Sequence, residues 1–194
     1  MKLRESGMPD EQYWESLFNI DLILDRLKIG SSLQDVTELG CGYGTFTIPV
    51  AKRIRGTIET IDIDPEMVTR TRQRAKEAGL KNIRAYVWDI LKEGFLSQGE
   101  SKDACLLFNI LHCEESIKIL SEAARIVRFG GWVLVIHWRW DIQTPRGPSP
   151  EIRPKPEQIV EWARKSGRLS LKGPTIDLPP WHYGIRLERM KVVS

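Results

Sequence analysis

A glycine-rich run lies between a predicted strand and a predicted helix. Its residues are Gly40, Cys41, Gly42, Tyr43 and Gly44. Glycine permits a tight turn and leaves room for a ligand beside the backbone. The spacing is GxGxG, and Thr45 stands where a dinucleotide fingerprint needs glycine or alanine. The run therefore matches a nicotinamide site poorly, and the chain has no GxxxxGK(S/T) sequence of a phosphate-binding loop.

Three acidic residues at predicted strand ends indicate which ligand the glycines approach. Glu38 precedes the glycines, Asp62 ends the second strand and Asp89 ends the third. A carboxylate at the position of Asp62 can accept both hydroxyls of a ribose. Asp89 can accept a hydrogen bond from an adenine amino group. Because parallel strands end at one sheet edge, the three carboxylates suit an adenosine ligand that carries positive charge.

Strand-like and helix-like segments alternate along the chain, and this alternation would position those residues. Strands are expected at 36–39, 57–61, 83–87, 104–110 and 132–138, and helices at 10–28, 45–55, 64–79, 116–127 and 156–165. Such alternation predicts a parallel sheet with helices on both faces. Residues 169–171 and 183–190 enclose no helix and are expected to form an antiparallel, hairpin-like edge.

Several segments together resemble the motifs of class I S-adenosylmethionine-dependent methyltransferases. They are VTELGCGYG (36–44), IDIDPEM (61–67), VWDI (87–90), LFNILH (107–112) and RFGG (128–131), the last with Phe129 in place of the usual proline. The resemblance covers about residues 32–138. It implies an α/β fold with a Rossmann-like, doubly wound, seven-stranded sheet. That sheet would be mostly parallel, with an antiparallel last strand and helices on both faces.

The same resemblance implies which residues hold the cofactor, S-adenosyl-L-methionine. The loop from Gly40 to Gly44 would cradle the methionine part, and Asp62 would hold the ribose. Glu38, which directly precedes the loop, is also expected to be a cofactor-binding residue. The remaining implied contacts are Ile63 and Met67 on the adenine face, Asp89 on the adenine amino group, Ile90 beside it, and Asn109 next to the sulfonium.

A base is needed only if the methyl acceptor carries a proton that is hard to lose, and two histidines are candidates. His112 follows the fourth strand, whose carboxyl end faces the cofactor, and is the better placed. Its alternative interpretation is a histidine at a helix start or on the surface. His137 lies within the fifth strand and is expected to be a core histidine. Cys113 is not expected to act as a nucleophile paired with His112, because adjacent helix residues point apart.

The proline-rich segment 139–156 is the expected substrate element, since long loops at strand carboxyl ends place ligand contacts in α/β proteins. Trp138 and Trp140 are expected to form a flat apolar wall. Arg146 is expected to pair with a carboxylate or phosphate. Further basic residues there are Arg139, Arg153 and Lys155. These residues favour an anionic or aromatic small molecule, and the alternative is a solvated loop stiffened by proline.

Composition bounds the remaining classes. The 194 residues fit one domain, and the net charge of +3 falls short of a dedicated nucleic-acid binder. The basic series Arg70, Arg72, Arg74 and Lys76 is spread around helix 64–79 and is expected to be a solvated face. Three cysteines without CxxC spacing predict neither a disulfide framework nor a metal site. Without a signal-like or membrane-spanning run, a cytoplasmic protein is expected.

The sequence therefore predicts a single methyltransferase domain over 1–194. Residues 1–30 would form an N-terminal helix, either packed on the sheet or acting as a lid, 32–138 the cofactor-binding core, and 139–194 the substrate loop, a helix and the last strands. The expected function is in-line transfer of the sulfonium methyl group to a small molecule. The alternatives are an RNA or protein methyltransferase and a module that binds the cofactor but transfers no methyl group. A nicotinamide oxidoreductase is disfavoured by GxGxG and Glu38.

Overall fold

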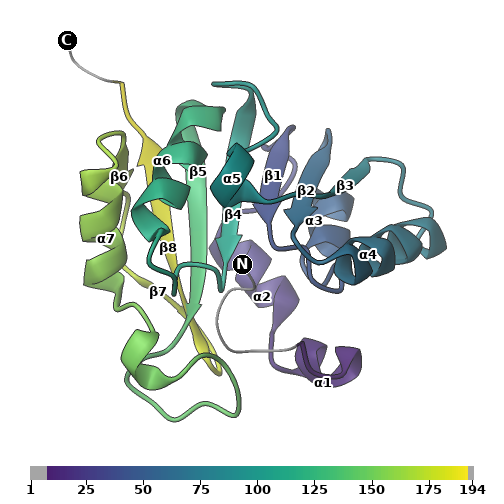
Figure 1. Ribbon diagram of the computed structural model, residues 1–194, viewed down its shortest axis with the longest axis horizontal. Coiled ribbons are helices and arrows are strands. Elements are labelled where there is room, and N and C mark those ends of the chain that lie inside the picture. The colour runs from purple at the N-terminus through teal and green to yellow at the C-terminus, as the bar shows by residue number, and fades with distance from the viewer. Residues whose placement is uncertain (1–7, 192–194) are drawn as a thin grey trace.

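An eight-stranded sheet forms the centre of the structure, a computed structural model that describes residues 8–191 (Figure 1). Its strands are β1 (Val36–Leu39), β2 (Ile58–Asp62), β3 (Ile83–Val87), β4 (Lys102–Phe108), β5 (Val127–Trp138), β6 (Leu169–Leu171), β7 (Ile176–Leu178) and β8 (His182–Arg189). The order is β3-β2-β1-β4-β5-β8-β6, and β7 also pairs with β8. The start of the expected N-terminal segment, residues 1–7, lies outside the described residues.

Strands β1 to β5 run parallel, and β8 is antiparallel to β5, β6 and β7. This pattern confirms the mostly parallel α/β sheet with an antiparallel last strand. The short β7 was not predicted, so the sheet has eight strands instead of seven. Strand β5 also begins earlier than expected, at Val127. The pairing of β5 with β4 shifts register between Lys102 and Ala104. Gly130, with φ of +73°, adopts the backbone conformation that lets β5 continue past this irregularity.

Helices cover both faces of the sheet (Figure 1). They are α1 (Glu11–Ser16), α2 (Ile20–Arg26), α3 (Thr47–Arg53), α4 (Pro65–Glu77), α5 (Ile90–Glu93), α6 (Ser116–Ile126) and α7 (Pro156–Lys165), with a 3₁₀ turn at Pro150–Ile152. Within residues 8–191, none of these helices has the length and apolar character needed to cross a membrane.

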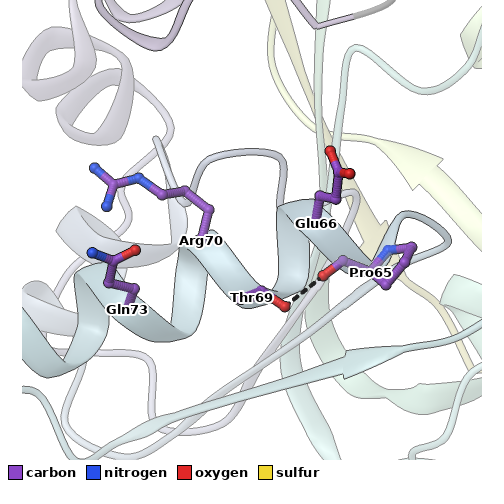
Figure 2. Close-up of a pocket in the computed structure, with 5 residues that line it drawn as sticks. All are labelled: Pro65, Glu66, Thr69, Arg70 and Gln73. Carbon is purple, nitrogen blue, oxygen red and sulfur yellow. Dashed lines mark hydrogen bonds between the residues drawn. The ribbon is translucent and has the colours of Figure 1, made fainter.

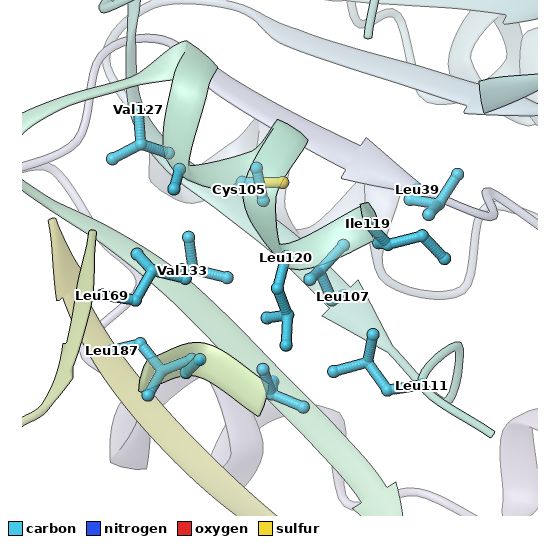
Figure 3. Packing of buried hydrophobic residues seen from close by; sticks show 14 of the residues in the cluster. Leu39, Cys105, Leu107, Leu111, Ile119, Leu120, Val127, Val133, Leu169 and Leu187 are labelled. Atoms are coloured by element: carbon cyan, nitrogen blue, oxygen red, sulfur yellow. The ribbon is translucent and has the colours of Figure 1, made fainter. Parts of the chain in front are cut away.

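Two large clusters of buried side chains lie on opposite sides of the sheet, because successive strand residues point to opposite faces. Figure 3 shows the cluster under α6, where Leu107, Val133 and Leu187 come from three strands and Leu120 comes from the helix. Leu106, the neighbour of Leu107, belongs to the other cluster, which packs under α2 and α3. The two layers fix the strand ends that carry the candidate site.

The segment 10–28 forms two helices instead of the one predicted. The Asp10 side chain accepts hydrogen bonds from the first turn of α1, which confirms it as an N-cap. Asn19 interrupts the helix, because its side chain accepts from Leu22 N–H and caps α2. Helix α2 buries Ile23 and Leu24, whereas α1 buries no residue. The two helices are therefore attached to the molecule by different forces.

Candidate active site

The carboxyl end of β1 opens into the glycine loop, residues 40–44. Gly40, Gly42 and Gly44 have φ values of +82°, +49° and +80°. A Cβ at Gly40 would lie 2.8 Å from the Ile110 Cδ1, and one at Gly44 would lie 3.2 Å from the Thr71 Oγ1. Other residues would be strained in this left-handed conformation, and the Ile110 and Thr71 side chains would have to move to admit a Cβ. The loop thus requires glycine, and it touches the segment that follows β4.

Asp62, the last residue of β2, supports the glycine loop through hydrogen bonds. The Gly42 N–H donates to its Oδ2 at 3.1 Å, and the Asp64 N–H donates to its Oδ1 at 3.0 Å. On the other side, the Thr71 hydroxyl donates to the Gly42 carbonyl at 3.0 Å. Burial raises the pKa of the Asp62 carboxyl, and the two N–H donors oppose that effect. Each carboxylate oxygen keeps capacity for another donor, such as a ribose hydroxyl.

Glu38 lies beneath the glycine loop and is only 2% exposed. Its Oε2 accepts hydrogen bonds from the hydroxyls of Thr47 at 2.5 Å and Thr60 at 2.9 Å. Burial raises the pKa of Glu38 to about 7, while the two threonine donors lower it. These contacts join β1 to β2 and to the start of α3, so Glu38 supports the loop from below. No local pattern in the sequence pointed to the two threonine partners.

The residues expected around adenine lie at the ends of β2 and β3. The Trp88 N–H donates to the Asp62 carbonyl at 2.8 Å, which joins the two strand ends. Ile63 is exposed there, and Asp89 caps α5 by accepting from the Leu91 N–H at 3.1 Å. Of the other two expected residues, Met67 is partly buried against Cys41, Val68 and Ala85, and Ile90 is buried in the core.

A shallow pocket of about 310 Å³ lies on the outer face of α4, near this edge of the sheet (Figure 2). Its lining residues are Pro65, Glu66, Thr69, Arg70 and Gln73. All of them come from one helix, and the Thr69 hydroxyl is used to donate to the Pro65 carbonyl. Because no residue of the glycine loop or of a strand end lines this pocket, we do not assign the cofactor to it.

Helix α1 is attached to α4 by ion pairs. Arg70 donates to Glu11 at 2.7 and 3.0 Å, and Arg74 donates to Glu15 at 2.5 Å. The Arg70 guanidinium holds the pKa of Glu11 below its usual value. The expectation of a solvated basic face is thus wrong for Arg70 and Arg74. Their partners lie 59 residues away in the sequence, which no local pattern reveals.

The residues just before α1 contact the glycine loop itself. The Tyr43 hydroxyl donates to the Pro9 carbonyl at 2.7 Å, and Arg74 donates to the Tyr43 carbonyl at 3.0 Å. A Cβ at Gly42 would lie 3.3 Å from the Met8 Cε. The chain from residue 8 to the end of α1 therefore covers one side of the loop.

The segment after β4 provides the second half of the site. Asn109 has a φ of +57°, and its Oδ1 is buried with no hydrogen-bond partner among the described residues. The His112 Nδ1 is also buried without a partner in that part of the chain. Burial lowers the pKa of His112. Backbone strain and unpaired buried polar atoms both concentrate at functional sites. Ile110 lies where a Cβ at Gly40 would be, so this segment is adjacent to the glycine loop.

The expected substrate wall is only half present. Trp138 is 1% exposed and packs edge-on against Trp14, beside Phe18 and His182. It therefore anchors the core instead of facing a ligand, a correction that follows from strand alternation. Trp140 remains partly exposed and lies edge-on to Tyr183, with ring centroids 5.4 Å apart.

The arginines of segment 139–156 mainly organise that segment. Arg139 pairs with Asp141 at 2.7 Å. Arg153 is buried and donates to the carbonyls of Pro148 and Arg139, each at 2.8 Å. Arg146 is half-buried, and its carbonyl accepts from the Thr144 hydroxyl. Because Arg139 and Arg153 already have partners, the anionic preference expected from these charges rests on fewer residues than the sequence indicated.

Residues 36–131 match a family model described as a methyltransferase domain. Aklanonic acid methyltransferase DauC from a Streptomyces species is 31% identical over 99 residues, which cover 50% of this chain and 44% of that protein. The 23S rRNA (uracil(1939)-C(5))-methyltransferase RlmD of Alcanivorax borkumensis is 35% identical over 74 residues, which cover 38% of this chain and 16% of that protein. The chain thus spans less than half the length of these curated relatives.

Solved structures share the fold across most of the chain. A SAM-dependent methyltransferase from Aquifex aeolicus superposes with a TM-score of 0.80 at 20% identity, over 93% of this chain and 94% of that one. The N-methyltransferase NodS from Bradyrhizobium japonicum gives 0.69 at 16% identity, over 94% and 100%. The family-model match, with the glycine loop and the strand order, identifies the chain as a member of the S-adenosylmethionine-dependent methyltransferases, and the solved structures show that it has the class I fold.

Proposed function

We propose that this protein transfers a methyl group from S-adenosyl-L-methionine to a small-molecule acceptor, with His112 as the base. The observation that carries the proposal is that the glycine loop and the segment after β4 lie next to each other. In that segment, the buried Asn109 Oδ1 and His112 Nδ1 have no hydrogen-bond partner among residues 8–191. The proposed cofactor-binding loop is thus adjacent to a segment whose buried polar atoms lack hydrogen-bond partners in the described part of the chain.

The residues at this edge fit the cofactor. The glycines present backbone without side chains, and the Asp62 oxygens have capacity for ribose hydroxyls. Ile63 and Asp89 are available to the adenine at the next strand ends. Asn109 would lie beside the sulfonium. When bound, S-adenosylmethionine supplies an electrophilic methyl group, so the protein has to hold and align the acceptor and exclude water.

His112 has the protonation state that a base requires. Burial lowers its pKa, so the imidazole is neutral at pH 7 and can receive a proton. As the pH falls through this lowered pKa, the imidazole becomes charged and the activity should be lost. The remaining exposure of the His112 side chain gives the proton a route to solvent.

A small molecule is the acceptor class that these features favour. The name of DauC describes methyl transfer to aklanonic acid, and DauC matches half of this chain. The RlmD match covers a smaller share, so it supports an RNA acceptor less. Arg70 and Arg74 are engaged with α1, which removes two residues from any basic track for RNA.

In this proposal, residues 8–16 act as a lid on the cofactor within one methyltransferase domain. The support is the pair of ionic contacts to α4 and the contact of Tyr43 with Pro9. Helix α1 buries no side chain, so it is held mainly by charged and polar contacts. Such contacts are individually weak at a surface, which suits a segment that opens and closes.

Calorimetry with S-adenosylmethionine, S-adenosylhomocysteine and NAD tests the assignment. We expect the first two to bind and NAD not to bind. Tight NAD binding without S-adenosylmethionine binding would overturn the proposal. A metabolite screen then tests methyl transfer by mass spectrometry, in which a methylated acceptor gains about 14 Da. If the cofactor binds but no metabolite, RNA or protein in the extracts tested is methylated, a non-catalytic binding module would be favoured.

A further inference from the structure

Trp138, the last residue of β5, is the point where two segments far apart in the sequence meet. From α1, Trp14 packs edge-on against its indole, with ring centroids 6.3 Å apart. From segment 139–156, the backbone of Gly147 lies on the same indole, because a Cβ there would be 2.8 Å from the Trp138 Cγ and Cδ2. Gly147 has a φ of +113°, so both its angle and its close approach require glycine. One buried ring thus contacts both the proposed lid and the expected substrate element.

The indole of Trp138 is held in place by the core. It is 1% exposed, and its centroid lies 4.2 Å from that of His182 and 6.1 Å from that of Phe18. His182 is opposite Trp138 in the pairing of β5 with β8, so the sheet itself brings these two rings together. Loss of the Trp14 ring would leave a void on one side of the indole, which could then tilt away from Gly147.

Helix α1 reaches Trp138 from the cofactor side of the site. Its Glu11 and Glu15 pair with arginines of α4, the helix that follows β2, whereas Trp14 reaches the end of β5. In the sheet order, β1 and β4 lie between β2 and β5. The carboxyl ends of β1 and β4 open into the glycine loop and into the segment after β4. Helix α1 therefore runs past both halves of the candidate site.

Segment 139–156 is held together as one unit by a buried arginine. Arg153 donates to the carbonyls of Pro148 and Arg139, each at 2.8 Å. Pro148 directly follows Gly147, and Arg139 is the first residue of the segment. The segment, drawn in green, lies at the same end of the molecule as α1 (Figure 1). The contact of Gly147 with the indole thus helps to position the whole segment.

We infer, building on the proposed function, that Trp138 is a positioning residue that couples α1 to segment 139–156. Cofactor held beneath α1 stabilises the closed position of this helix, which keeps Trp14 against the indole. The indole then stays in place for Gly147, and the segment expected to contact the acceptor is fixed. Such coupling is reciprocal, so an acceptor held by this segment strengthens the binding of the cofactor.

Limited trypsin digestion of the full chain, with and without saturating S-adenosylhomocysteine, tests this inference. Trypsin cleaves after arginine, and the bond between Arg146 and Gly147 lies at the contact with the indole. When local opening and closing are fast, the cleavage rate follows the population of the open segment. Residues 172–174 provide an internal control, because they repeat the order of residues 146–148, a basic residue followed by glycine and proline. A Cβ at Gly173 would meet no atom within 4 Å, so no ring lies against this second site.

We expect S-adenosylhomocysteine to slow cleavage after Arg146 by about fivefold or more, which is the lower end of the usual range for coupled sites. Cleavage after Lys172 should change by less than about twofold, because this residue lies outside both segments. Mass spectrometry of the products distinguishes the two cuts, and calorimetry establishes that the ligand is bound.

Two pairs of variants separate positioning from a purely structural role. Trp14→Leu removes the ring on the indole, and Tyr13→Leu is its control, since Tyr13 is 43% exposed and contacts no other ring in the described part of the chain. Gly147→Ala displaces the backbone from the indole, and Gly173→Ala is its control, since both glycines have positive φ. Trp14→Leu and Gly147→Ala should each reduce the slowing after residue 146 to less than about twofold, although the ligand still binds. The two controls should keep the slowing seen in the wild type.

The outcomes distinguish this inference from the proposed function. If S-adenosylhomocysteine does not bind, the proposed function fails and the inference fails with it. If it binds but leaves cleavage after Arg146 unchanged, or slows both cuts equally, Trp138 does not couple the two segments. The same conclusion follows if Trp14→Leu and Tyr13→Leu behave alike. In those cases the cofactor assignment would still stand.

Discussion

The cofactor half and the acceptor half of the site solve different problems. At the glycine loop, the backbone conformation is fixed and its hydrogen bonds are made, as shown by Gly42 between Asp62 and Thr71. At the acceptor half, Asn109 and His112 carry buried polar atoms without partners among residues 8–191. The backbone of the glycine loop is held without a ligand, although the Asp62 oxygens keep capacity for one, whereas the buried polar atoms of the second half still lack partners in the described part of the chain. The difference teaches that the acceptor half recognises its ligand through polar atoms whose hydrogen-bonding capacity the described residues leave unused.

Removing His112, the proposed base, should give the largest effect and should act on only the acceptor half. His112→Gln is expected to lower turnover by about a hundredfold to ten-thousandfold, the usual range for loss of a general base. Cofactor affinity should change by less than about twofold, since the glycine loop is untouched. Steady-state kinetics and calorimetry check the two expectations. Cys113→Ser is the neighbouring control, and equal losses in both variants would refute a proton-transfer role.

Removing the Asp62 carboxylate, the proposed ribose ligand, should damage the cofactor half. Asp62→Ala is expected to weaken S-adenosylmethionine binding by about a hundredfold, because it removes an acceptor of hydrogen bonds and the support of Gly42. Asp64→Ala is the control, because Asp64 caps α4 through the Glu66 N–H. That variant should cost about 1 kcal/mol of stability and little affinity. An unchanged dissociation constant for Asp62→Ala would remove Asp62 from the site.

Two glycines with similar backbone angles sharpen the comparison further. Gly40→Ala meets Ile110 at 2.8 Å, whereas Gly79→Ala, with φ of +66°, meets no atom within 4 Å. Both should lose about 1–2 kcal/mol of stability from the left-handed conformation. Only Gly40→Ala should also reduce cofactor affinity, by about tenfold, because either Ile110 or the loop has to move to admit the methyl group. Chemical denaturation and calorimetry separate the two effects. Equal affinities would show that the loop adapts.

The contact between α1 and α4 should give a smaller effect, on the cofactor half only. Arg74→Gln removes donors to Glu15 and to the Tyr43 carbonyl. We expect cofactor dissociation to become about two- to fivefold faster, since surface ion pairs contribute up to about 1 kcal/mol. Stopped-flow fluorescence of the tryptophans measures the rate. Arg72→Gln is the control, because Arg72 donates to the Ala85 carbonyl and not to α1. Identical rates in all three proteins would rule out the lid.

The smallest effect concerns stability at the base of the glycine loop. Burial raises the pKa of Glu38 to about 7 from an ordinary value of 4.5, so the folded state holds a proton that the unfolded state has lost. This stabilisation is complete below pH 4.5 and is lost as the pH rises through about 7.

Glu38→Gln has no such proton to lose. Its free energy of unfolding should therefore rise relative to wild type across that window, by at most about 1.4 kcal/mol per pH unit. Above about pH 8 the two curves should run parallel. Urea unfolding at a series of pH values tests this. Parallel curves throughout would show that Glu38 is ionised in the folded protein.

Much of the fold was predictable because its signals are local. Strand β1 at 36–39 and β3 at 83–87 agree with the expected segments, as does helix α7 at 156–165. The break at Asn19 was missed because the apolar spacing continues through it. Strand β7 was missed because it has three residues and depends on pairing with β8, which comes later in the chain.

The candidate site was predictable where backbone conformation leaves its mark on sequence. The three glycines of the loop adopt the positive φ values that favour glycine. The role of Trp138 was misjudged because the face of a strand residue depends on the packing of the whole sheet. Whether the His137 Nε2 finds a partner among the described residues likewise depends on which residues of β4 and β8 surround it. Such information exists only after long-range pairing.

The separation of α1 from α2 at Asn19 has a consequence for amide hydrogen exchange. Helix α2 places Ile23 and Leu24 in the core, so its amides should exchange only with large openings of the molecule. Helix α1 buries no residue, so its amides should exchange through a local opening that leaves the sheet intact. Protection of α1 would then rise when a ligand is held beneath it. The exchange rates of the α1 amides would thus report whether the site is occupied, at exchange times too short for the amides of the core to respond.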